Sequence, residues 1–127
     1  MGIFKRKQNK IEEIKTDEKK YIIPYSKGYK GFKRFSFVVY GDEISEQNNK
    51  KLLNNDISNS NIEFICFNCK TSKFDGRLTQ IFIDGLQIGA IFENEQINLI
   101  ENGQIEKIHF EKDLTRERLI LFVKYKE

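Results

Sequence analysis

Apolar and polar residues alternate along several short runs of this chain, the pattern of half-buried β-strands. In "RFSFVVY" (34–40) the alternation puts Phe35, Phe37 and Val39 on one face, and Gly41 ends the run. "NIEFICFNC" (61–69) alternates in the same way. Four further strands are expected at 78–83, 86–92, 104–111 and 118–125, and Asp84-Gly85 between the first two predicts a two-residue hairpin turn because Gly tolerates positive φ.

Two polar stretches between these runs suit short helices. Residues 43–55 predict a helix that Ser45 caps, with Ile44, Leu52 and Leu53 reaching the core. Residues 94–101 predict one or two helical turns before Asn102-Gly103. Six strands with one or two short helices predict a small, mainly β fold, a six-stranded barrel or sandwich.

Charge divides the 127 residues unevenly. Residues 1–34 carry 11 Lys and Arg against 4 Asp and Glu, a net of +7, whereas residues 35–127 have a net of −4. We therefore expect a charged arm at 1–20, flexible or weakly helical, a connecting segment rich in aromatic and basic residues at 21–34, and a β domain at 35–127. The basic arm is equally consistent with attraction to phosphate, of nucleic acid or of a membrane surface, and with a solvated tail.

Hydropathy and the N-terminal sequence bear on location. No apolar run approaches the roughly 20 residues of a membrane span, and "MGIFKRKQNK" lacks the apolar region of a secretory signal. We expect a cytoplasmic protein without an integral membrane segment. The oligomeric state is not predicted.

The residues with candidate chemistry do not form a catalytic pattern. Cys66 and Cys69 lie three apart on a predicted strand, so their thiols point to opposite faces, and a zinc site lacks ligands because the chain has 2 Cys and 1 His. His109, between Ile108 and Phe110, is interpreted as a partly buried structural residue. We expect no enzyme, no metal and no cofactor.

The segment "YSKGYKGFKRF" (25–35) interleaves aromatic rings with basic side chains. Single-strand binders combine such groups, because rings stack on bases and cations hold phosphates. The candidate nucleic-acid-binding residues here are Tyr29, Lys30, Phe32, Lys33 and Arg34. The alternative is that Phe35 and Phe32 begin the core while the lysines only face solvent.

The order of motifs resembles the HIRAN family, small β-domains that occur alone in bacterial and phage proteins and fused to chromatin-remodelling helicases. Its pattern is a strand ending in Gly, a polar connection, a second strand, an Asn-x-Tyr-Asp-x-Asn-Ala-Ile-x-Val segment and Gly-x-x-Ile-Gly-Tyr-Ile. The matching parts here, over residues 35–101, are "FVVYG", "IEFICF", "KFDGRLTQIFI" and "GLQIGAI". Ala90 replaces the last Tyr, and Asp42 and Glu43 stand where DNA-binding members tend to be basic and aromatic.

The resemblance implies a ligand as well as a fold. HIRAN domains that bind DNA recognise the 3′-hydroxyl end of a single strand. By that likeness Asp75 would accept a hydrogen bond from the terminal hydroxyl, Phe74 would border the base pocket, and Arg77 would help the 29–34 segment hold phosphates.

Two functions are expected from the sequence. The first is a non-enzymatic binding module for single-stranded DNA or DNA 3′ ends. The alternative is a protein-interaction or accessory module whose basic N-terminal arm docks on a protein or a membrane surface.

Overall fold

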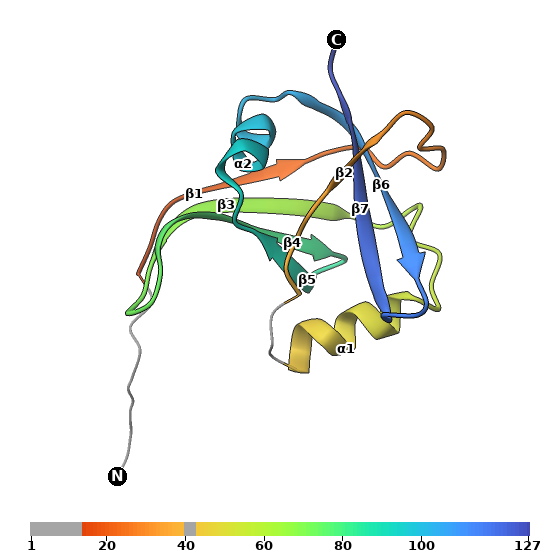
Figure 1. The fold of residues 1–127 in the computed structure, drawn as a ribbon, viewed down its shortest axis with the longest axis horizontal. Helices are drawn as coiled ribbons and strands as arrows, with labels where there is room; N and C mark the ends of the chain where they lie inside the picture. The colour runs from red at the N-terminus through yellow and green to blue at the C-terminus, as the bar shows by residue number, and fades with distance from the viewer. Residues whose placement is uncertain (1–13, 40–42) are drawn as a thin grey trace.

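The computed structural model describes residues 14–39 and 43–127, and this part of the chain forms seven strands and two helices. Their order is β1 (Ile14–Ile22), β2 (Lys33–Phe35), α1 (Glu43–Leu52), β3 (Ile62–Lys70), β4 (Asp75–Ile83), β5 (Leu86–Ile91), α2 (Asn94–Glu101), β6 (Ile105–Asp113) and β7 (Arg118–Tyr125). The strands build two antiparallel sheets, in the orders β1-β3-β4-β5 and β2-β7-β6 (Figure 1). The arrangement is sandwich-like and not a closed barrel. The predicted mainly β class is confirmed, with one strand more than expected.

The main core lies between the two sheets. Alternate residues of the strands point into it, and burying each large side chain contributes about 1.5–3 kcal/mol. Its fully buried members include Phe64, Cys66, Ile81, Ile83, Ile88, Ile108, Leu119 and Leu121. The opposite face of β3 belongs to a second cluster with Phe67, Cys69, Leu78 and Ala90. The two thiols therefore lie on opposite faces of β3, as predicted.

The turn and the second helix expected from the sequence are both confirmed. Asp84 and Gly85 have φ of 51° and 82°, the paired positive values of a type I′ hairpin turn. The Asp84 carboxylate also accepts a hydrogen bond from the Asn61 amide at 2.8 Å. α2 spans Asn94–Glu101 and packs on β4, at the end of the fold away from α1 (Figure 1).

Part of the expected arm is a strand. Residues 14–22 form β1 and pair with β3, with a bulge between Thr16 and Lys19 where Asp17 has a φ of 54°. The expectation of a weakly helical segment is therefore wrong for residues 14–20, and for residues 1–13 it lies outside the described residues. An edge strand needs no apolar face of its own when the backbone of β3 supplies its hydrogen bonds.

The strand expected at 34–40 is divided between the two sheets. β2 pairs with β7 and ends at Phe35, and Val38 then forms a bridge with Ala90 on β5, with N–O distances of 2.8 and 2.9 Å. Phe35 and Phe37 are buried as predicted. Residues 40–42 lie outside the described residues.

α1 differs from its prediction at its N-terminal turn. Ser45 is buried inside the helix and is not its cap, and Ile44 is exposed instead of reaching the core. Leu52 is buried and Leu53 packs against the core, as predicted. Asn49 fixes the helix, because its amide donates to the Ile88 carbonyl and its oxygen accepts the Leu119 amide, at 2.9 and 3.0 Å.

Candidate nucleic-acid interface

The segment that follows β1 crosses to the second sheet and lies along β6. The Ser26 amide donates to the Ile108 carbonyl at 2.7 Å, and the Ile108 amide donates to the Pro24 carbonyl at 3.0 Å. A turn then closes where the Phe32 amide donates to the Tyr29 carbonyl at 3.0 Å, with Gly31 at a φ of 81°. This turn directs the chain into β2 and leaves Tyr29 over the outer face of the sheet.

Tyr29 lies flat on His109. The ring centroids are 4.3 Å apart and the planes differ by 8°, and the Tyr29 hydroxyl donates to Oε1 of Glu111 at 3.0 Å. The Tyr29 ring also contacts Phe122, with centroids 5.1 Å apart. Tyr29 remains 38% exposed, so an aromatic surface is open to solvent above the buried His109.

Arg34, Phe122 and His109 form one row across the sheet. Arg34 on β2 is the register partner of Phe122 on β7, and Phe122 is the partner of His109 on β6. The next row, Phe35, Leu121 and Phe110, is in the core, so Arg34 and Phe122 face outward. Phe122 is half-buried and Arg34 is exposed.

Tyr29 and Arg34 of the predicted segment thus lie beside Phe122, a ring that was not predicted to take part. We call this surface the loop face: Tyr29, Arg34 and Phe122, with Lys30 and Phe32 of the adjoining turn. Lys33 pairs with the buried Val123 and therefore starts from the other face of β2. Lys30, Lys33 and Arg34 are exposed, and Phe32 is half-buried. Lys107 and Lys124, register partners on β6 and β7, add positive charge on the outer side of the same sheet, and Lys124 lies 3.7 Å from Glu106.

The hydrogen bonds of Glu111 shift its own pKa and the pKa of the Tyr29 phenol. The hydrogen bond from His109 lowers the pKa of Glu111, and the bond from Tyr29 acts in the same direction. In turn, the hydrogen bond to Glu111 raises the pKa of the Tyr29 phenol. At neutral pH the carboxylate is therefore ionised and the phenol is neutral.

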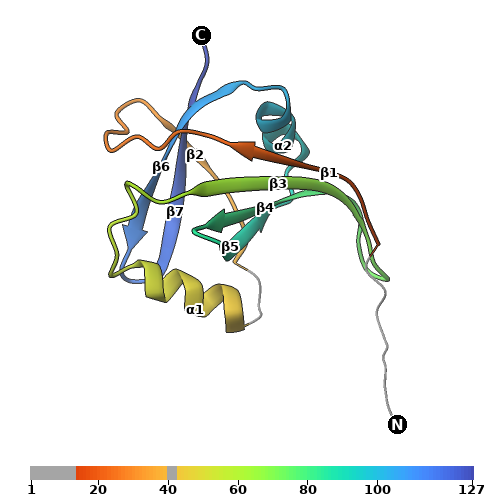
Figure 2. The same ribbon diagram turned by 180° about the vertical axis from the view of Figure 1, so that it is seen from behind.

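The residues selected by the family resemblance lie elsewhere. Figures 1 and 2 place the β3–β4 turn and the 26–32 loop at opposite ends of the molecule. At the turn Phe74 packs edge-on against Phe92, with centroids 5.3 Å apart, and Asp75 is exposed at the start of β4. The Thr71 hydroxyl, rather than the Asp75 carboxylate, accepts the turn amides of Lys73 and Phe74, at 3.1 and 2.9 Å.

Arg77 is committed to internal contacts. Its Nε donates to Glu101 on α2 at 2.7 Å, Nη1 donates to Asn68 at 3.0 Å, and Nη2 donates to the Asp17 carbonyl at 3.2 Å. The hydrogen bond to Glu101 raises the pKa of the guanidinium. The expectation that Arg77 joins the 29–34 segment on phosphate does not agree with this geometry, because the guanidinium holds β1, β3 and α2 together at the other end.

His109 and Phe122 could have been found from the sequence in part. His109 and Glu111 are two apart on a strand and share a face, which is a local signal. Phe122 is brought beside His109 only by the register of the β6–β7 hairpin, which depends on the geometry of the 114–117 turn.

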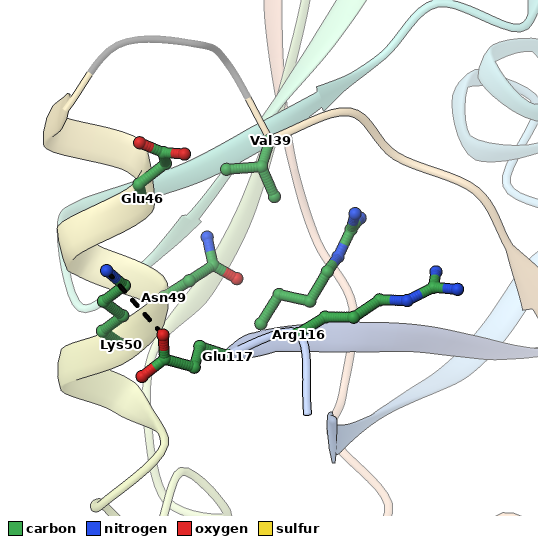
Figure 3. Close-up of a pocket in the computed structure, with 7 residues that line it drawn as sticks. Val39, Glu46, Asn49, Lys50, Arg116 and Glu117 are labelled. Carbon is green, nitrogen blue, oxygen red and sulfur yellow. Dashed lines mark ion pairs between the residues drawn. The ribbon is translucent and has the colours of Figure 1, made fainter. Parts of the chain in front are cut away.

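A separate pocket of about 280 Å³ lies between α1 and the start of β7 (Figure 3). Its lining carries charges of both signs, and Lys50 lies 3.8 Å from Glu117. Arg118 donates to the Phe37 carbonyl at 3.0 Å and covers the Phe37 ring. These internal pairings make the pocket a weaker candidate than the loop face.

Comparison with known proteins adds no further guide. No family model, curated protein or solved structure matches the chain. In residues 14–39 and 43–127, no helix is both long enough and apolar enough to span a membrane.

Proposed function

We propose that the chain is a non-enzymatic module that binds single-stranded DNA on the loop face. The observation that carries the proposal is the outward row of Arg34 and Phe122 beside the exposed Tyr29 ring. Bases stack on the two rings, and the backbone phosphates lie against Arg34 and Lys30.

The physical basis is general. Stacking of a base on an aromatic side chain contributes about 1–3 kcal/mol, which corresponds to roughly five- to hundredfold in the dissociation constant. Each Lys or Arg that contacts a phosphate adds counterion release, so binding weakens as salt rises. A duplex keeps its bases paired and stacked, and it therefore binds this face less tightly than a single strand does.

An NMR titration tests the location. A short single-stranded oligonucleotide is added to the ¹⁵N-labelled protein at low salt, and amide shifts are followed. We expect the largest changes within 29–34 and at Phe122. Changes confined to 70–77, or spread evenly over the surface, contradict the loop face as the binding site.

The family resemblance supports a second, more specific proposal, that the module recognises a free 3′ hydroxyl through Asp75. It is favoured by the exposed position of Asp75 beside Phe74. An esterified oxygen has no proton to donate to a carboxylate, so a 3′-phosphate would lose this contact. Oligonucleotides that end in a 3′ hydroxyl or a 3′ phosphate, tested on the wild type and Asp75→Asn, decide it. Equal affinity for both ends in the wild type refutes end recognition but leaves binding on the loop face standing.

A further inference from the structure

His109 is enclosed by groups that accept hydrogen bonds at both of its nitrogens. Nδ1 lies 2.7 Å from the Ser26 carbonyl oxygen, and Nε2 lies 2.9 Å from Oε2 of Glu111. The Tyr29 ring covers the imidazole at 4.3 Å, and the Tyr25 ring lies 5.4 Å away at 29°. The side chain is almost completely buried.

The two hydrogen bonds can both form only with a doubly protonated ring. A carbonyl oxygen only accepts, and an ionised carboxylate only accepts, so both ring nitrogens must donate. A neutral imidazole has one N–H and would leave one of the two contacts unmade. The stacked tyrosine ring also favours a cation beneath it.

The charges around the imidazole are of both signs. Glu111 on β6 contacts the imidazole directly, and Asp56 lines the same pocket beside His109, together with Lys112. The Tyr25 hydroxyl is occupied by the Phe110 carbonyl at 3.2 Å. From β7 the neighbour is the uncharged Phe122, and Arg34 on β2 lies beyond it in the same row.

The same contacts hold the loop in place. The Ser26 carbonyl is hydrogen-bonded to His109, and the Tyr29 ring stacks on His109 while its hydroxyl donates to Glu111. Ser26 and Tyr29 both belong to the segment that precedes β2. Removal of one proton from His109 breaks one of its two hydrogen bonds and weakens the cationic stack under Tyr29.

We propose that doubly protonated His109 is a positioning residue that holds Tyr29 in its binding orientation, so that affinity for single-stranded nucleic acid falls as pH rises. This inference rests on the function proposed above. The ligand class is the same, and the inference adds regulation by the protons that His109 donates to Ser26 and Glu111.

The protonation state is measurable without any ligand. His109 is the single histidine of the chain, so in an untagged protein every imidazole signal belongs to it. A ¹⁵N-detected pH series between about 5.5 and 8.5 brackets the usual titration range. We expect two protonated ring nitrogens while the Tyr29 ring is stacked, and faster amide exchange in 26–32, corrected for intrinsic rates, once one proton is lost. A neutral ring with an unchanged loop overturns the proposal.

Binding measurements then separate positioning from simple charge. Fluorescence anisotropy with a short single strand is run over the same pH series on the wild type, His109→Gln, Tyr29→Ala and Lys51→Ala. We expect the wild type to weaken by about tenfold at the high end, the equivalent of one net hydrogen bond to a charged group. His109→Gln should lose this dependence. Lys51→Ala, which changes an exposed residue of α1, should keep it.

The Tyr29→Ala variant gives the decisive comparison. His109→Gln is expected to remove part of the pH dependence of the affinity. If His109 acts through Tyr29, Tyr29→Ala removes the same part. If Tyr29→Ala keeps the full dependence, His109 contributes only its charge and the positioning role is refuted. Absence of wild-type binding at every pH refutes the proposed function, whereas the ligand-free NMR series still decides whether His109 holds the loop.

Discussion

Arg77 and Glu101 join the first sheet to α2. The guanidinium on β4 donates to both carboxylate oxygens, and the two side chains are 19% and 17% exposed. Nη2 also donates to the Asp17 carbonyl at the bulge of β1. One side chain thus fixes three elements that are far apart in the sequence.

Replacement of Arg77 should destabilise the fold without acting on the loop face. Arg77→Ala leaves the half-buried Glu101 carboxylate without its partner, and we expect a loss of about 2 kcal/mol in the free energy of unfolding. Amide exchange should rise first in β1. Arg116→Ala, whose side chain is 71% exposed and 4.0 Å from Asp113, should cost less than about 0.5 kcal/mol in the same denaturant titration. Equal effects of the two changes contradict the bridging role.

Gly89 is a position where a side chain cannot be accommodated. A Cβ there would lie 2.5 Å from the Val38 carbonyl oxygen and 2.7 Å from the Phe37 ring, at a φ of 157°. Gly89→Ala should therefore cost about 3 kcal/mol or more, because the Val38 bridge must move away from β5. Gly28→Ala, with open space around its Cβ, is the control and should change stability little. A near-neutral Gly89→Ala would show that the bridge is not needed.

Stability should depend on pH through Glu111. Its pKa in the folded protein is below the ordinary value of 4.5, chiefly because His109 donates to it. The contribution to stability is therefore complete above about pH 4.5 and is lost as pH falls through the lower folded-state pKa. Glu111→Gln should be less stable than the wild type near pH 7, by no more than about 1 kcal/mol for so exposed a group, and the difference should shrink in acid. Unfolding curves at a series of pH values measure it, and a difference that grows in acid has the wrong sign.

The thiols should be unreactive in the folded protein. Burial raises the pKa of Cys66 to about 11, and Cys69 is buried on the other face of β3. A disulfide reagent at about pH 8 should react slowly with the native chain and rapidly with the chain in denaturant. Fast reaction of one thiol in the native protein would place it at the surface.

The elements that were predicted correctly are those that depend on interactions between residues close together in the sequence. The Asp84-Gly85 turn and the alternation on β3 follow from backbone sterics and from the two faces of a strand, and both were recognised. β1 was missed because its residues carry no apolar face, and its hydrogen bonds come from β3, about fifty residues later. The division of 34–40 between two sheets was missed because Phe35, Phe37 and Val39 alternate without interruption.

The candidate site was predicted only where its residues are neighbours in the sequence. Tyr29 and Arg34 share one surface because a single turn and a short strand hold them, whereas Lys33 alternates with Arg34 and lies in the row of the buried Val123. Arg77 looked available for phosphate because its partner Glu101 is twenty-four residues away, on a helix that the sequence could not orient. Phe122 lies on this surface because of the register between β6 and β7, which no local sequence pattern predicts.

Salt-dependent fluorescence anisotropy with a short single-stranded oligonucleotide tests the central claim most directly. The wild type, Tyr29→Ala, Arg34→Ala and the control Lys51→Ala are compared at low and moderate salt, with the matching duplex as a second ligand. We predict that the wild type binds the single strand more tightly than the duplex, that Tyr29→Ala weakens binding by roughly fivefold or more, and that Arg34→Ala reduces the salt slope by about one phosphate contact. Lys51→Ala should bind as the wild type does. No binding by the wild type at low salt, or equal losses for Arg34→Ala and Lys51→Ala, would contradict the account.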